Sequence, residues 1–208
     1  MRRHFRELYI SQPYIAVFAS GHSVEQLSER DIARIRERSF MITMNYAPVK
    51  LRGHLNKWSD FGVTTWINER YQNRPKDHLF LARERALRRG NTELVPKVDY
   101  WFNERKERLG GHLTLVWLLQ LLERHFADKT VLLFGLDLQY YSADRAKWYD
   151  DYTDHDKHYR KRLDWEFTHR QCAHQMDQFV KRPGQFRNCN PDSAYHRFAK
   201  VNWKEVLA

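Results

Sequence analysis

The sequence predicts an α/β fold in which helices flank an open, mostly parallel sheet. Short apolar runs rich in β-branched and aromatic residues alternate with segments of helical periodicity along the chain. One run, residues 130–134 (Thr-Val-Leu-Leu-Phe), is apolar almost throughout, as in a parallel strand that is buried on both faces. Small residues directly follow several of these runs, which is typical of the turn between a strand and a helix.

The first half of the chain begins with a strand, a turn and a helix. Residues 14–19 form the strand, residues 20–23 (Ser-Gly-His-Ser) the turn, and residues 24–38 an amphipathic helix. The pattern is weaker from residue 70 to residue 108. The remaining elements expected here are strands at 40–44 and 79–82, a third strand that ends within 57–60, a weak helix at 61–69, a loop or polar helix at 83–89, and a short helix or extended segment at 100–108.

The second half carries a buried helix at residues 113–126 that leads into the strand at 130–134. Residues 142–164 are rich in charged and aromatic side chains without a clean period, so we interpret them as a lid. A helix at 165–181, a strand at 186–189 and a terminal helical stub at 203–207 complete the pattern. The 208 residues therefore predict one Rossmann-like domain over residues 1–208.

The net charge of +10 indicates either anionic partners or simply a solvated basic surface. The two cysteines cannot form a disulfide framework, and we expect a reducing, cytoplasmic location. The N-terminus has no secretory signal pattern, and the longest apolar stretch is about half a membrane span. Peripheral contact with the inner membrane face stays open.

The carboxyl ends of the predicted strands carry the candidate binding residues. Ser20, Gly21 and Ser23 lie between a strand and a helix start, where a phosphate could approach the backbone. The alternative is an ordinary turn in which Ser23 caps the helix. Asn45 follows the second strand and could hold a ribose, a base edge or a phosphate, or serve only as a turn residue.

Two further turns offer the same choice between ligand binding and structure. Gly110 and Gly111 open the buried helix and could contact an anion through their backbone, or act as simple turn residues. Gly135 and Asp137 follow the strand at 130–134. Asp137 could bind a ribose hydroxyl, a metal or an amine, or it could cap a neighbouring element.

Histidine and aspartate side chains gather around the predicted lid. The segment 150–158 resembles metal-binding segments in composition but matches no metal motif, so a solvated loop is the simpler interpretation. His169 follows the lid and could act as a general base, although chance placement is easy among 11 histidines.

Taken in order, these motifs resemble the bacterial lipooligosaccharide sialyltransferases of glycosyltransferase family 42. The motifs are the turn 20–23, Asn45, the pair at 110–111, the run 131–137, His169 and the tail 188–193 (Asn-Cys-Asn-Pro-Asp-Ser). A related group of flagellin-modification and hydroxymethylpterin pyrophosphokinase-like proteins shares this core. The stretch 70–108 matches poorly.

The resemblance implies a GT-A-like variant that needs no metal and uses a nucleotide-sugar as co-substrate. It implies His169 as general base, and tyrosines that bind the donor phosphate. Asp60 or Ser59 stands where the family has an Asn after the third strand, and Ser20 stands where the family usually has Asn in the first turn. The donor-binding residues implied are Ser20, Gly21, Ser23, Asn45, Asp60, Gly110, Gly111, Gly135, Asp137, Tyr140 and Tyr141.

The function expected is therefore a metal-independent glycosyltransferase with a CMP- or UDP-linked donor. Its acceptor would be anionic, either a surface glycan or lipooligosaccharide, or a hydroxymethylated base in DNA. Two alternatives stay open: an ATP- and Mg²⁺-dependent pyrophosphokinase-like phosphotransferase, with Asp137 and residues 150–156 as metal ligands, and a non-catalytic nucleic-acid-binding module.

Overall fold

The structure is a computed structural model, and it describes residues 2–19, 21–44, 51, 53–57, 79–84, 98–138 and 165–208. Within these residues the α/β prediction is confirmed. The described strands form a 9-stranded sheet in the order β1-β6-β5-β4-β3-β2-β7-β8-β9, and every pairing between neighbours is parallel. The strands are β1 (Arg3–His4), β2 (Tyr14–Phe18), β3 (Ser39–Met44), β4 (Leu55–Lys57), β5 (Leu79–Arg83), β6 (Tyr100–Phe102), β7 (Thr130–Phe134), β8 (Phe186–Asn188) and β9 (Ala199–Lys200).

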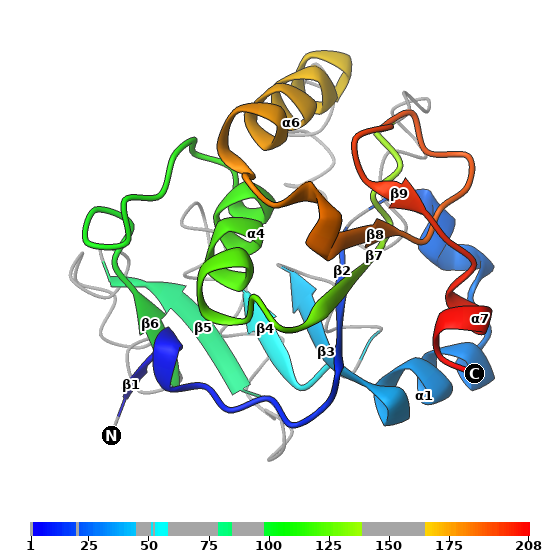
Figure 1. Cartoon of the computed structure of the whole chain (residues 1–208), viewed down its shortest axis with the longest axis horizontal. Coiled ribbons are helices and arrows are strands. Elements are labelled where there is room, and N and C mark those ends of the chain that lie inside the picture. Colours follow the sequence, from blue (N-terminus) through cyan, green and yellow to red (C-terminus); the bar gives the residue numbers. More distant parts are fainter. Residues whose placement is uncertain are drawn as a thin grey trace, which may run out of the picture.

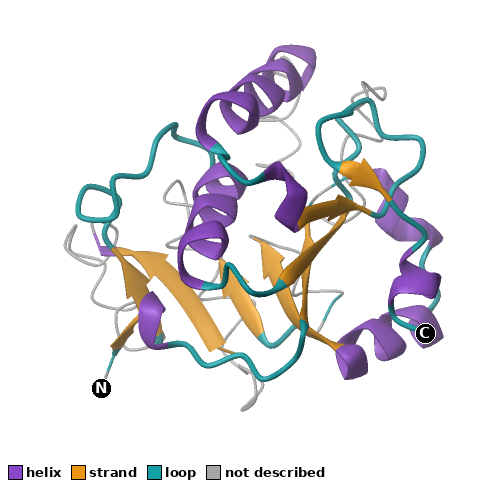
Figure 2. Cartoon of the chain, viewed as in Figure 1, coloured by secondary structure: helices purple, strands orange, loops and turns teal. Residues whose placement is uncertain are grey.

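Helices cover both faces of this sheet (Figures 1 and 2). The α-helices are α1 (Glu29–Arg38), α4 (Thr114–His125), α6 (Trp165–Phe179) and α7 (Trp203–Val206), and the 3-10 helices are η1 (Phe5–Glu7), η2 (His22–Gln26) and η6 (Pro183–Gln185). Helix α4 packs on one face and against α6, whereas α1 and α7 lie on the opposite face.

The alternation of side chains along β2 explains why both faces can be buried. Ile15 and Val17 belong to the apolar cluster that includes α4, while Ala16 and Phe18 belong to the cluster that includes α1 and α7. All four side chains are fully buried. A strand with apolar residues on both faces is suited to the centre of a parallel sheet, and β2 lies there, between β3 and β7.

The prediction of a single helix over residues 24–38 was wrong at its start. Residues His22–Gln26 form the 3-10 helix η2, and α1 begins only at Glu29. The reason is a capping box: the Ser28 hydroxyl accepts the Asp31 backbone N–H at 3.1 Å, and the Asp31 carboxylate accepts the Ser28 N–H at 3.0 Å. This pair fixes Ser28 as the N-cap.

Most other predicted elements agree with the structure to within a few residues. The exceptions are the two-residue edge strands β1 and β9, which no sequence pattern indicated, and residues 100–108, where β6 is followed by turns. The third strand, β4, occupies Leu55–Lys57, so it includes the first residue of the strand end that was expected at 57–60, and residues 58–60 lie outside the described residues. The predicted lid at 142–164 and the weak helix at 61–69 lie outside the described residues.

The strand order reverses direction between β2 and β7. From β2 the chain proceeds through β3, β4, β5 and β6 toward one edge, and then returns to place β7, β8 and β9 on the other side of β2. In open parallel sheets the loops at such a reversal diverge to opposite faces and leave a crevice beyond the strand carboxyl ends. The fold therefore puts the turns after β2 and β7 next to each other.

Candidate functional site

The turns that follow β2 and β7 are joined directly through their backbones. Phe18 pairs with Phe134 at the ends of the two strands. Beyond this pair, the Ala19 N–H donates to the Phe134 carbonyl at 2.8 Å, and the Gly21 N–H donates to the Gly135 carbonyl at 2.9 Å. The two turns thus form one unit at the strand-order reversal.

Glycine is required on both sides of this unit. Gly135 has φ +70°, a backbone conformation that residues with a Cβ rarely adopt. A Cβ on Gly21 would lie 2.3 Å from the Gly135 carbonyl oxygen, which is far inside van der Waals contact. The structure thus brings together Gly21 and Gly135, two of the predicted donor-binding residues, and shows why each is a glycine.

Asp137 organises the turn instead of presenting an open carboxylate. Its side chain is buried, and one oxygen, Oδ2, accepts the Ser23 backbone N–H at 2.8 Å. The other oxygen, Oδ1, accepts the Ser23 hydroxyl and the Asn190 Nδ2 amide, the latter at 2.8 Å. The carboxylate therefore caps the first turn of η2, which is the structural alternative that the sequence left open.

A third segment, the loop after β8, packs against residues 136–137. Asn188 Nδ2 donates to the Leu136 carbonyl at 3.1 Å, and the Ser193 hydroxyl donates to the same carbonyl at 2.5 Å. The Ala194 N–H donates to the Asp137 carbonyl at 2.9 Å. Directly beyond, Leu138 has φ 48°, so the chain leaves this point in a conformation that is uncommon for a residue with a side chain.

The loop after β8 supplies further residues of the site. The sequence pointed to them only as part of the motif at 188–193. Asn188, Asn190 and Ser193 each bond to the 136–137 segment, but no role was predicted for any of them. The available signal was a dense run of Asn, Asp, Pro and Ser directly after a strand. Such a run predicts a turn, and it carries no information on which strand end the turn will meet.

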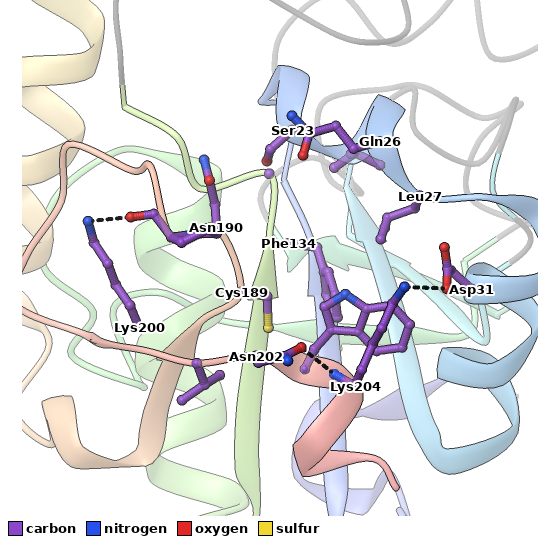
Figure 3. A pocket seen from close by; sticks show the side chains of 15 residues that line it. Ser23, Gln26, Leu27, Asp31, Phe134, Cys189, Asn190, Lys200, Asn202 and Lys204 are labelled. Carbon is purple, nitrogen blue, oxygen red and sulfur yellow. Dashed lines mark hydrogen bonds and ion pairs between the residues drawn. The ribbon is translucent and has the colours of Figure 1, made fainter.

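A cavity of about 550 Å³ opens beside this point, between η2, the end of β7, the loop after β8 and the start of α7 (Figure 3). Leu27, Phe134 and Trp203 form its apolar wall. The Trp203 ring packs edge-on against Phe134, with ring centroids 6.1 Å apart. The polar and charged residues that line it include Ser23, Gln26, Asp31, Asn190, Lys200, Asn202 and Lys204.

Two lysines, Lys200 and Lys204, line the cavity from opposite sides (Figure 3). Lys200 Nζ donates to the Pro191 carbonyl at 2.7 Å, and Lys204 Nζ lies 3.5 Å from Asp31 Oδ1. Both side chains are exposed and can turn toward a ligand. The cavity therefore combines an apolar aromatic wall with mobile positive charge, which suits a ligand that carries both a ring and an anionic group.

Cys189 also lines the cavity, but its thiol is not activated as a nucleophile. Burial raises the pKa of the Cys189 thiol to about 12, although a hydrogen bond with the backbone of Leu133 partly offsets this. Burial likewise raises the pKa of Cys172 to about 12. A thiol that stays protonated at neutral pH is a poor nucleophile.

Compared with protein-family models and with curated proteins, the chain matches none.

Gly110 and Gly111 serve the packing of two helices. The Gly110 N–H and carbonyl both bond to the Gln120 side-chain amide, each at 2.9 Å. The Gly111 carbonyl accepts the Trp117 indole N–H at 3.1 Å. A Cβ on Gly110 would lie 2.0 Å from the Phe179 ring of α6. These contacts favour the interpretation as a turn over a role in anion binding.

Two buried glutamines hold this turn, and the sequence did not single them out. Gln120 lies within α4, and Gln175 of α6 accepts the His112 N–H through Oε1 at 3.0 Å. A Gln on a largely apolar helix was the available signal for Gln120. A buried amide of this kind is retained where it bonds to backbone that would otherwise be unsatisfied.

His169 lies on α6, with its side chain partly buried. It is not among the described residues that line the cavity beside Asp137. The remaining predicted site residues, Ser20, Asn45, Asp60, Tyr140 and Tyr141, lie outside the described residues, as does the segment 150–158.

In the part of the chain that the structure describes, no group of three His, Cys, Asp or Glu side chains is arranged to hold a metal ion. The helices described here are all too short or too polar to cross a membrane.

Proposed function

We propose that this chain is a metal-independent glycosyltransferase, and that the nucleotide of its donor binds in the cavity beside the β2–β7 turns. The observation that carries the proposal is the coincidence of this cavity with the reversal of strand order. Ligands of open parallel sheets bind at this position because the loops on either side diverge there. The choice of glycosyl transfer rests on the resemblance of the ordered motifs to the sialyltransferases.

The lining residues suggest how each part of a nucleotide would be held. Leu27 and Trp203 offer an apolar wall for a base or sugar ring, and the exposed Gln26 amide can pair with a polar edge. Lys200 and Lys204 can supply positive charge to the donor phosphates. Asp137 acts indirectly in this proposal, since its carboxylate positions η2 by binding Ser23.

His169 is the proposed general base. One imidazole nitrogen would take the proton of the acceptor hydroxyl while that oxygen forms a bond to the anomeric carbon of the sugar. The bond between the sugar and the phosphate breaks, and the nucleotide leaves with the electron pair. An ordinary histidine pKa near 6.5 suits proton removal near neutral pH.

Binding of mononucleotides tests the proposal first. Titration calorimetry with CMP, UMP and ATP, each with and without Mg²⁺, should give binding of a pyrimidine nucleotide that does not depend on magnesium. The double variant Lys200→Gln/Lys204→Gln should weaken this binding by at least about tenfold, because even one charged hydrogen bond is worth about 1.5–3 kcal/mol. Lys106→Gln, an exposed lysine outside the cavity, should have no effect.

Turnover tests the reaction itself. Hydrolysis of CMP- and UDP-sugars should be detectable, and His169→Ala should abolish it without weakening nucleotide binding. Absence of turnover with every donor would overturn glycosyl transfer. ATP binding that requires magnesium would favour the phosphotransferase, and salt-dependent DNA binding without any mononucleotide binding would favour the nucleic-acid-binding module.

A further inference from the structure

We propose that a second cavity, on the face of the sheet covered by α4 and α6, is a binding site for a phosphate-bearing ligand. This cavity has a volume of about 650 Å³ and lies between the turn at 108–110, the later part of α4 and residues 179–182. It shares no lining residue with the cavity beside Asp137. The proposal therefore stands independently of glycosyl transfer.

Cationic side chains from three separate segments converge on this second cavity: Arg108, Arg124, Lys181 and Arg182. Glu123, the one acidic residue among the described residues of the lining, accepts the backbone N–H of Arg182. Arg124 pairs with Glu107 at 3.0 Å. Among the described residues, no carboxylate pairs with the guanidinium of Arg108 or of Arg182. The cavity thus keeps positive charge that the described part of the chain does not neutralise.

The backbone at Arg108 gives a second, independent observation. The Leu109 N–H donates to the Glu104 carbonyl at 2.8 Å, and the Arg108 N–H donates to the Arg105 carbonyl at 3.0 Å. These are the two hydrogen bonds of a Schellman motif, in which the residue at the position of Arg108 is left-handed and is usually glycine. Arg108 has φ 48° and is exposed.

An arginine in a left-handed position, where glycine is preferred, lowers the stability of the protein. We infer that this cost is tolerated because the side chain binds a ligand. Both neighbours fix the turn: Leu109 packs against the apolar core, and Gly110 bonds to Gln120. The backbone that carries Arg108 is therefore fixed at the edge of the cavity, which the Arg108 side chain lines. Local departures of this kind concentrate at sites where the side chain binds something.

The size of the cavity selects the kind of ligand. A volume of about 650 Å³ is typical of small-molecule sites, which span about 300–1,000 Å³. Guanidinium groups bind phosphate oxygens through paired N–H donors, and several such groups together favour a ligand with more than one negative charge. A terminal phosphate or pyrophosphate group fits this description better than a nucleic-acid strand, which needs an extended groove.

Titration calorimetry with inorganic pyrophosphate at physiological salt tests the site. Arg108→Gly should weaken binding at least about tenfold, because it removes one charged partner of the phosphate. The same variant should melt at or above the temperature of the unmodified protein, because glycine is the preferred residue in this turn. Arg182→Gln should weaken binding to a similar extent while its backbone N–H still bonds to Glu123.

Two controls define the outcome. Arg105→Ala removes an exposed arginine of the same turn that does not line the cavity, and Lys200→Gln/Lys204→Gln removes the cations of the other cavity. Both should keep pyrophosphate affinity. The proposal is overturned if pyrophosphate does not bind, if Arg108→Gly and Arg182→Gln both leave affinity unchanged, or if either control loses as much affinity as they do. A short single-stranded oligonucleotide that displaces pyrophosphate with higher affinity would assign the cavity to nucleic acid instead.

Discussion

Ser23 and Asp137 are joined by two hydrogen bonds although 114 residues separate them in the sequence. The Ser23 N–H reaches Oδ2 at 2.8 Å and its hydroxyl bonds to Oδ1, so one residue occupies both carboxylate oxygens. The contact ties the start of η2 to the end of β7. The contact therefore positions η2, whose residues line the neighbouring cavity.

Replacing Asp137 by Asn should destabilise the fold by about 2–3 kcal/mol, since an NH₂ group would then face the donors of Ser23 or Asn190. Urea denaturation monitored by tryptophan fluorescence measures this loss. The matched control is Asp128→Asn, whose carboxylate is exposed and pairs with Lys129 at the surface, and we expect a change within about 0.5 kcal/mol. Equal losses in the two variants would contradict the assigned role of Asp137.

Replacing Gly135 by Ala should destabilise the protein by about 2 kcal/mol or more, because the new side chain is strained and clashes. The Cβ would lie 2.8 Å from Val24 Cγ2 and 3.0 Å from the Ala19 carbonyl oxygen, in a backbone with φ +70°. Gly184→Ala is the control, since its Cβ would meet no atom within 4 Å. Thermal melting of both variants decides the matter: an unchanged melting temperature for Gly135→Ala would show that the turn rearranges easily.

Replacing Gly110 by Ala should push α6 away from α4 and cost about 1–3 kcal/mol, the usual range for overpacking. The cause is the Phe179 ring, which the new Cβ would approach to 2.0 Å. The double variant Gly110→Ala/Phe179→Leu should therefore lose less stability than the sum of the two single variants. Strict additivity in a double-mutant cycle would mean that Gly110 and Phe179 do not limit each other.

Acidification should weaken the fold through His4. Burial lowers the pKa of His4 below its ordinary value of 6.5, and the nearby Arg6 and His125 act in the same direction, while the carboxylate of Glu107 opposes them. A histidine with a lowered pKa in the folded state stabilises the protein above pH 6.5, and this stability is lost as the pH falls further. The free energy of unfolding at pH 7 and pH 5, from urea titrations, should thus differ less in His4→Gln, and an identical difference in both proteins would refute the role of His4.

Several parts of the fold could be predicted because local sequence patterns determine them. The runs that became β2 and β7 are apolar enough to require burial on both faces, and α4 is apolar on most sides. The edges could not be predicted in this way. The strands β1 and β9 are two residues long, and the exposed residues of β9 carry no hydrophobic signal.

For the candidate site, too, the positions of some residues could be predicted from the sequence, but their contacts could not. Gly21, Ser23, Gly135 and Asp137 could be predicted to lie at strand ends, because each stands within four residues of the end of an apolar run. The packed fold was needed to show that Asp137 binds Ser23 and Asn190, that Gly110 lies against Phe179, and that Arg108 and Arg182 line one cavity. These contacts depend on the order in which the strands assemble and on how the helices pack over them. Strand order and helix packing arise from the whole chain, and no local pattern of residues encodes them.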